Sequence, residues 1–130
     1  MKSSASLQQI ALVVNDYDEA IEFYTMKLGF DLLEDKQMSE TKRWVVVAPK
    51  NSMCQLLLAK AVGDEQISRI GNQTGGRVFL FLYTQNFTDE YNYMKENGVE
   101  FERERTEEVW GTVAVFKDLY GNLWDFIQRK

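Results

Sequence analysis

Residues 10–30 read IALVVNDYDEAIEFYTMKLGF and decide how the first part of the chain folds. The aliphatic run at the start predicts a buried strand, because aliphatic and β-branched residues favour strands. Asp16 and Glu19 have the spacing of a capping box, which predicts that a helix begins beside them. Apolar residues then recur at helical spacing until Gly29, a residue suited to end a helix. The stretch therefore predicts a strand followed by a helix over 17–28.

The same order of elements is predicted a second time further along the chain. The first copy is completed by three more strands, and the second copy repeats strand, helix and three strands. The expected strands are 7–14, 30–37, 43–49 and 53–60 in the first copy and 77–83, 99–103, 110–117 and 123–128 in the second, whose helix spans 87–97. A polar, glycine-rich stretch over 61–76 predicts a linker with a short helical turn at 64–70. We therefore predict one α+β domain of two βαβββ modules, 7–60 and 77–130.

Composition excludes several classes of function. The chain has 130 residues, one cysteine and no histidine. Without imidazole there can be no Ser-His-Asp or Cys-His nucleophile, and the usual ligand of zinc, iron and nickel sites is missing. The net charge of -5, with no basic tract, argues against a nucleic-acid partner.

The apolar runs of the sequence are too short to cross a bilayer, and the N-terminus lacks the apolar core of a signal peptide. Cys54 has no second cysteine with which to form an intrachain disulfide, and its apolar surroundings predict a core residue. We therefore expect a soluble cytoplasmic protein without a membrane partner.

Two stretches of the chain resemble the vicinal-oxygen-chelate superfamily, which includes glyoxalase I, bleomycin-resistance proteins and extradiol dioxygenases. Residues 10–30 resemble the opening module of that superfamily. Residues 116–125, FKDLYGNLWD, resemble its closing strand-turn-strand signature. The resemblance implies a curved mixed sheet around a cleft for a small molecule, and a homodimer in many members.

The resemblance also implies where a site would lie. Members that use a metal place its ligands at the start of the first and fifth strands and on the fourth and eighth. Matched residue by residue, these positions hold Gln9, Arg77, Gln55 and Asp125. A fixed cation at Arg77 repels a metal ion, and two amides with one carboxylate are weak ligands for transition metals. We therefore expect no cofactor and disfavour a divalent metal.

An arginine in an apolar cleft suits a carboxylate, enolate or phosphate group of a ligand. Strand alternation groups Arg77 with Phe79 and Phe81, and it places Trp124 with Phe126 toward the helix. Trp110 is expected in the cleft and Arg43 at its mouth. The candidate ligand-binding residues are thus Gln9, Gln55, Arg77, Asp125, Phe79, Trp110 and Arg43. The alternative, given equal weight, is that Arg77 and Asp125 only pair with each other.

The leading hypothesis is a metal-independent protein that binds a carboxylate-bearing or oxygen-rich small molecule. A second hypothesis is a lyase, isomerase or dioxygenase in which Asp125 acts as a base or as a weak metal ligand. A third is an interaction module without a ligand, whose cleft is filled by side chains.

Overall fold

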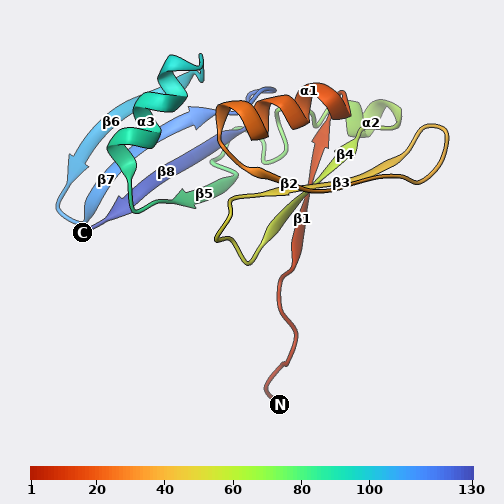
Figure 1. Cartoon of the computed structure of the whole chain (residues 1–130), viewed down its shortest axis with the longest axis horizontal. Coiled ribbons are helices and arrows are strands. Elements are labelled where there is room, and N and C mark those ends of the chain that lie inside the picture. The colour runs from red at the N-terminus through yellow and green to blue at the C-terminus, as the bar shows by residue number, and fades with distance from the viewer. The chain divides into compact units, whose positions relative to one another are not determined.

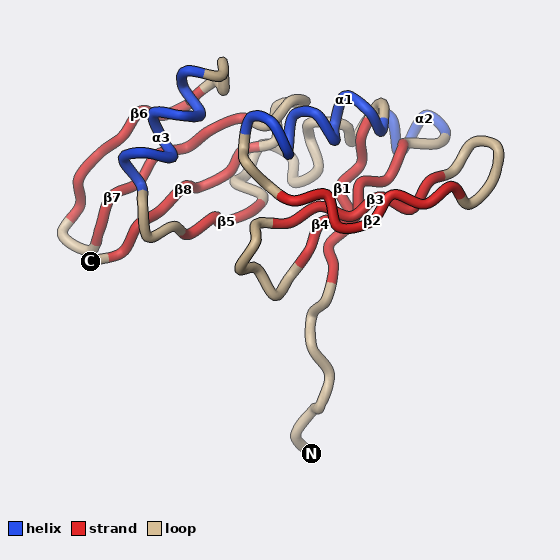
Figure 2. The backbone as a smooth tube through the Cα atoms, viewed as in Figure 1, coloured by secondary structure: helices blue, strands red, loops and turns tan.

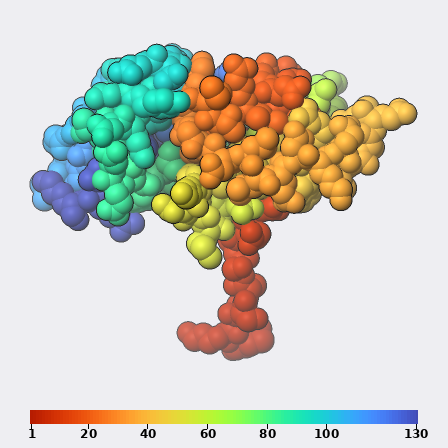
Figure 3. Space-filling view, in the orientation of Figure 1, coloured from red at the N-terminus to blue at the C-terminus, as the bar shows by residue number.

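The computed structural model describes residues 1–130, and contacts within the chain divide it into two units, Met1–Ala61 and Val62–Lys130. In the first unit, β1 (Gln9–Val14) is followed by α1 (Tyr17–Glu22), its π-helical continuation η1 (Phe23–Lys27), β2 (Asp31–Gln37), β3 (Arg43–Ala48) and β4 (Gln55–Lys60). These strands form one four-stranded sheet in the order β1-β4-β3-β2 (Figure 1). Residues 1–8 precede β1 as an exposed segment without regular structure, which extends away from the sheet in Figure 3.

The second unit repeats this arrangement after a short helix, α2 (Gly63–Ile67). It contains β5 (Leu80–Tyr83), α3 (Phe87–Glu96), β6 (Phe101–Glu108), β7 (Gly111–Lys117) and β8 (Leu123–Arg129). The strand order is β5-β8-β7-β6, which corresponds strand for strand to the first sheet. Figure 2 shows each helix and strand against the connecting loops. The predicted pair of βαβββ modules in an α+β fold is confirmed.

Capping and packing explain why these segments form the predicted elements. The Asp16 carboxylate accepts a hydrogen bond of 2.9 Å from the Glu19 backbone N–H, as the capping box predicts. Gly29 has a φ of 74°, the left-handed conformation that glycine adopts without strain. The helix in between ends as a π-helix, where the Thr25 hydroxyl donates to the Ile21 carbonyl and competes with the regular backbone ladder.

Each sheet has one face packed against its own helix. In the first unit Leu12 and Val14 of β1 are fully buried there, while Ala11, which precedes Leu12 and points to the other face, is exposed. In the second unit the Phe87 ring on α3 lies 4.7 Å from the Phe126 ring on β8. Burying these apolar side chains supplies most of the folding free energy, at about 25 cal/mol per Å².

Two predicted strand boundaries differ from the observed ones by three residues or more. The fifth strand begins at Leu80, three residues later than expected, so Arg77 lies in the segment that leads into it. The sixth strand is longer than expected and runs to Glu108, through a charged stretch without apolar alternation. That stretch forms an edge strand with nearly all its residues exposed, so it needs no apolar face.

No helix is long and apolar enough to span a membrane.

Candidate functional site

The two glutamines of the predicted site are neighbours in the first sheet. Gln9 and Gln55 are direct partners in the parallel ladder between β1 and β4. Partners in a ladder present their side chains on the same face, here the face that carries Ala11 rather than the helix-packed Leu12. The register therefore places these two amides side by side on one face of the first sheet. Their role in binding stays a prediction.

Arg43 has a structural role in the first unit. Its guanidinium donates to both carboxylate oxygens of Asp35, at 3.1 and 2.7 Å, and to Asp18 at 2.9 Å. It also lies 5.2 Å from the centre of the Tyr17 ring, and its backbone N–H donates to the Tyr17 hydroxyl. The hydrogen bond from Arg43 lowers the pKa of Asp35, and both carboxylates raise the pKa of Arg43. Arg43, which was expected at the mouth of a cleft, therefore links helix α1 to the β2–β3 hairpin through these two aspartates. We infer that it does not belong to the ligand site.

The face of the second sheet opposite α3, called here the helix-free face, carries two exposed aromatic rings. Phe81 and Tyr83 alternate along β5 onto this face and are 58% and 50% exposed. Their direct ladder partners on β8 are Asp125 and Ile127. The Arg129 guanidinium lies 4.5 Å from the centre of the Tyr83 ring. A soluble domain rarely exposes aromatic rings side by side without a binding role, so this face is the leading candidate.

Asp125 is the one carboxylate in the middle of the helix-free face. It stands between Phe81 on β5 and Val115 on β7, and the register continues from Val115 to Arg103 on β6. Burial raises the pKa of Asp125, and attraction by Arg103 partly opposes this shift. Phe81, Asp125, Val115 and Arg103 therefore form one row across the sheet, from edge to edge.

Arg77 does not belong to this row. The ladder partner of Asp125 is Phe81, four positions beyond Arg77, which corresponds to about 13 Å of extended chain. Arg77 is exposed and forms no ion pair, so the alternative of a simple Arg77–Asp125 pair is wrong. Phe79 lies closer, because its backbone N–H donates to the Leu123 carbonyl and continues the ladder. Ligand-binding roles for Arg77 and Phe79 stay predictions.

Trp110 lies in the turn between β6 and β7 and is 51% exposed. The face that it was expected to share with Ala114 and Phe116 is the one packed against α3, because Phe116 packs against the rings of Trp124 and Phe126. The prediction that strand alternation places Trp110 in a cleft is therefore wrong, because Trp110 lies outside the strand. The expectation that Trp124 packs in the core with Phe126 is confirmed.

The sequence indicated Arg103 only as a cation near a strand end, which could either draw an anionic ligand toward the mouth of the cleft or keep an edge strand soluble, and not as a ligand-binding residue. The register of β6 shifts on both sides of Arg103, so simple alternation along that strand does not give its face. The signal that could have identified it is the pairing of β6 with β7, which aligns Arg103 with Val115 and so with Asp125. Arg103 is exposed and forms no ion pair or hydrogen bond.

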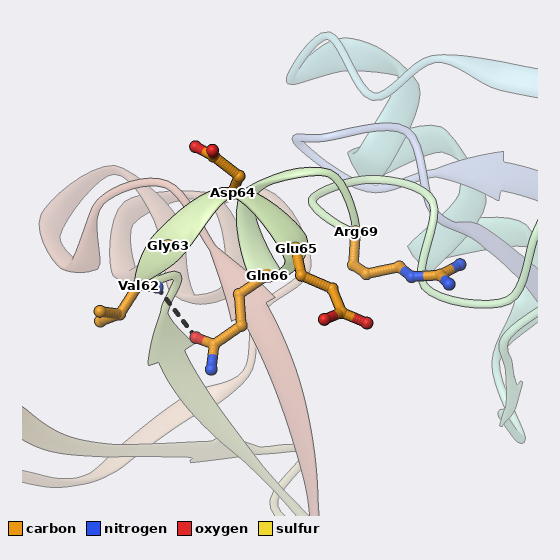
Figure 4. A pocket seen from close by; sticks show the side chains of 6 residues that line it. All are labelled: Val62, Gly63, Asp64, Glu65, Gln66 and Arg69. Carbon is orange, nitrogen blue, oxygen red and sulfur yellow. Dashed lines mark hydrogen bonds between the residues drawn. The ribbon is translucent and has the colours of Figure 1, made fainter.

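A shallow depression of about 540 Å³ surrounds α2 and is lined by Val62, Gly63, Asp64, Glu65, Gln66 and Arg69. Figure 4 shows the Asp64 side chain pointing away from those of Glu65 and Arg69, while Gln66 accepts a hydrogen bond from the Val62 backbone N–H. All the lining residues are exposed, and no buried polar group points into it. The depression therefore lacks the buried polar groups that would hold a ligand in place.

Comparisons with known proteins agree with the fold. A protein of Shewanella frigidimarina (strain NCIMB 400) is 59% identical over 125 residues, which cover 95% of this chain and 93% of the relative. The crystal structure of UcmS2 superposes with a TM-score of 0.83 at 30% identity, over 96% of this chain and 98% of that one. TnmS3, an antibiotic binding protein from Streptomyces sp. CB03234, superposes with a TM-score of 0.79 at 27% identity over 100% of both chains.

The sequence also matches a family profile over nearly its whole length. The match covers residues 6–126, which include both resembling stretches and both sheets. The chain therefore belongs to the Glyoxalase/Bleomycin resistance protein/Dioxygenase superfamily.

Proposed function

We propose that the protein binds a flat, oxygen-bearing aromatic molecule on the helix-free face of the second unit and holds it without a metal and without chemical change. The observation that carries this proposal is the exposure of Phe81 and Tyr83 side by side, next to Asp125. Aromatic rings stack on other aromatic faces and gain about 0.5–1.5 kcal/mol beyond the burial of area. A flat ligand would recover that energy, which a saturated ligand of the same size would not.

The polar groups of the face set the orientation of the ligand. Most of a small-molecule site is apolar, and a few polar groups determine which way the ligand lies. Here the apolar surface comes from the two aromatic rings, with Ile127 beside Tyr83 and Val115 beside Asp125 on the same face. Asp125 supplies a hydrogen-bond acceptor at the centre. This combination favours a ligand with at least one hydroxyl or N–H group on its aromatic ring.

The chemistry of the available donors does not fit a divalent metal. Two amides, one carboxylate and an arginine stand at the positions where metal-dependent members carry ligands, and a guanidinium has no lone pair to offer. No three cysteine, aspartate or glutamate side chains lie close enough together to hold an ion. These observations support binding by direct contact between protein and ligand.

Similarity to TnmS3 supports the class of ligand. That protein is an antibiotic binding protein, and its structure covers the whole of this chain. We infer that the ligand here is likewise an antibiotic or a similar natural product, and the exposed rings of Phe81 and Tyr83 favour one that is aromatic. Sequestration needs only affinity, which fits a face that has no nucleophile and no histidine.

The test uses 2-naphthol and its saturated analogue decahydro-2-naphthol, which differ mainly in planarity. We expect 2-naphthol to raise the melting temperature of the protein by mass action, and the saturated alcohol to do so much less. Phe81→Ser should abolish the difference, whereas Tyr93→Ser, which removes an exposed ring from α3, should keep it. Chromatography after incubation should return the 2-naphthol unchanged. Equal shifts with both alcohols, or an unaffected Phe81→Ser variant, would refute the proposal.

A second candidate function is proton transfer by Asp125. The observation that favours it is the raised pKa of this partly buried carboxylate, because a general base works best when its pKa lies nearer the working pH. Exchange of the acidic benzylic C–H beside the carbonyl of 2-tetralone for deuterium, followed by NMR, tests it. Exchange that is faster than in buffer and is lost in Asp125→Asn would support a lyase or isomerase.

Assembly and location stay predictions. Membership of the superfamily leads us to infer a homodimer in the cytoplasm. Light scattering on the purified protein should give twice the chain mass of 15.2 kDa. A mass equal to one chain at micromolar concentration would contradict the dimer.

A further inference from the structure

Arg103 is the cation on the helix-free face whose side chain forms no hydrogen bond or ion pair, and its one interaction there is a longer-range attraction for Asp125. Arg129 is placed over the Tyr83 ring, and Lys117 forms ion pairs with Glu100 and Glu102 at 3.6 and 3.3 Å. Arg103 has neither an ion pair nor a hydrogen bond. An arginine whose five donors are all available is the natural receptor for an acidic oxygen.

The sheet fixes how far Arg103 lies from Asp125. Asp125 pairs with Val115, and Val115 pairs with Arg103, so two strand spacings separate them. This corresponds to about 10 Å between backbones, at about 4.8 Å for each spacing. Val115 between them is buried and apolar, so the two polar groups are separated by an apolar floor. A flat ligand resting on that floor could reach Arg103 at one end and Asp125 at the other.

We propose that Arg103 and Asp125 together select hydroxyaryl carboxylates, with Arg103 donating to the ligand carboxylate and Asp125 accepting from the ligand hydroxyl. This inference rests on the proposed function, since it assumes that the ring stacks on Phe81. The inference goes beyond the proposed function because it assigns the acidic group of the ligand to Arg103. The superfamily pattern would assign that group to Arg77.

The opposite charges of the two residues explain why one ligand would need both groups. A carboxylate without a hydroxyl would bind Arg103 but would be repelled by the nearby Asp125. A hydroxyl without a carboxylate would satisfy Asp125 and leave Arg103 in water. The overall charge of -5 disfavours anions in general, so an anionic ligand needs the local positive charge at Arg103.

The experiment measures the affinities of 2-naphthol, 2-naphthoate and 6-hydroxy-2-naphthoate by NMR titration for wild type and four variants, Arg103→Gln, Asp125→Asn, Arg77→Gln and Phe81→Ser. Arg103→Gln should weaken the two carboxylates about tenfold, as expected for loss of a charge-assisted hydrogen bond, and leave 2-naphthol within about twofold. Asp125→Asn should weaken 2-naphthol and strengthen 2-naphthoate, because the variant loses the hydrogen-bond acceptor for the hydroxyl and the charge that repels the carboxylate. Arg77→Gln is the matched control, because it removes the same charge from another exposed arginine of the same unit.

Different outcomes separate the two claims. If Arg103→Gln weakens all three probes equally, or if Arg77→Gln reproduces its effect, the assignment of Arg103 is wrong while stacking on Phe81 still stands. If wild type binds none of the probes, or if Phe81→Ser binds them as wild type does, the proposed function fails and this inference fails with it. Thermal melts of each variant will show whether it is folded.

Discussion

Phe81 and Asp125 are direct partners in the parallel ladder between β5 and β8, so an exposed aromatic ring and a partly buried carboxylate lie side by side on one face of the sheet. Neither β5 nor β8 alone carries both the exposed ring and the carboxylate on this face. It arises because the second unit repeats the βαβββ order, which places its first and last strands next to each other. The same register in the first unit joins Gln9 to Gln55, two neutral amides. The two units therefore offer chemically different faces built on one topology.

Asp125→Asn should stabilise the protein at neutral pH. Burial raises the pKa of Asp125, so the folded protein binds this proton more tightly than the unfolded chain does. Stability therefore decreases as pH rises above the ordinary aspartate pKa of about 4. We expect Asp125→Asn to melt at a higher temperature than wild type at pH 7, with a margin that disappears near pH 3. A variant that melts lower at pH 7 would contradict this.

Arg43→Gln should change stability with a pH dependence opposite in sign to that of Asp125→Asn. The hydrogen bond from Arg43 lowers the pKa of Asp35, so its stabilising effect is present above about pH 4 and is lost as pH falls through the folded pKa. We expect a loss of about 1 kcal/mol in urea unfolding at pH 7, and less at pH 3. Arg69→Gln, which removes a surface arginine without an ion pair, serves as control. Affinity for 2-naphthol should not change, and a large loss would restore Arg43 to the site.

Gly71→Ala should destabilise the second unit more than Gly75→Ala. Both glycines have positive φ, 73° and 69°, so alanine costs about 1 kcal/mol at either position. Only at Gly71 would the added Cβ collide, lying 1.8 Å from the Tyr120 carbonyl oxygen, while at Gly75 it would meet nothing within 4 Å. Urea unfolding should show a further loss of about 1–3 kcal/mol for Gly71→Ala. Equal losses would mean that the segment over 61–76 behaves as a free linker.

Removal of metal should leave binding intact. We expect freshly purified protein to contain far less than one metal ion per chain by elemental analysis. Dialysis against EDTA should not change its affinity for 2-naphthol. A stoichiometric ion whose removal abolishes binding would favour the metal-dependent alternative.

Local sequence patterns predicted most of the elements, because those patterns act within a few residues. The capping box at Asp16 and the left-handed Gly29 marked helix boundaries that the structure shares. Alternation along β1 and β8 correctly separated Leu12 and Trp124, which face the helices, from Gln9 and Asp125.

The site could be predicted only in part, because it depends on pairing between strands that are far apart in sequence. The register shifts around Arg103 hid its face, and extending alternation beyond β7 misplaced Trp110, which lies in a turn. Family positions pointed to Arg77, yet β5 begins after it, so the cation and the carboxylate are out of register. Charge networks such as that of Arg43 are likewise set by tertiary contacts, which no local pattern encodes.

An NMR titration of isotope-labelled protein with 6-hydroxy-2-naphthoate tests the central claim most directly. The account predicts that the largest chemical-shift changes fall on the backbone amides of Phe81, Tyr83 and Asp125, with Arg103 Nε–H shifting as well. Changes confined to the first unit around Gln9 and Gln55, with β5 and β8 unaffected, would contradict it.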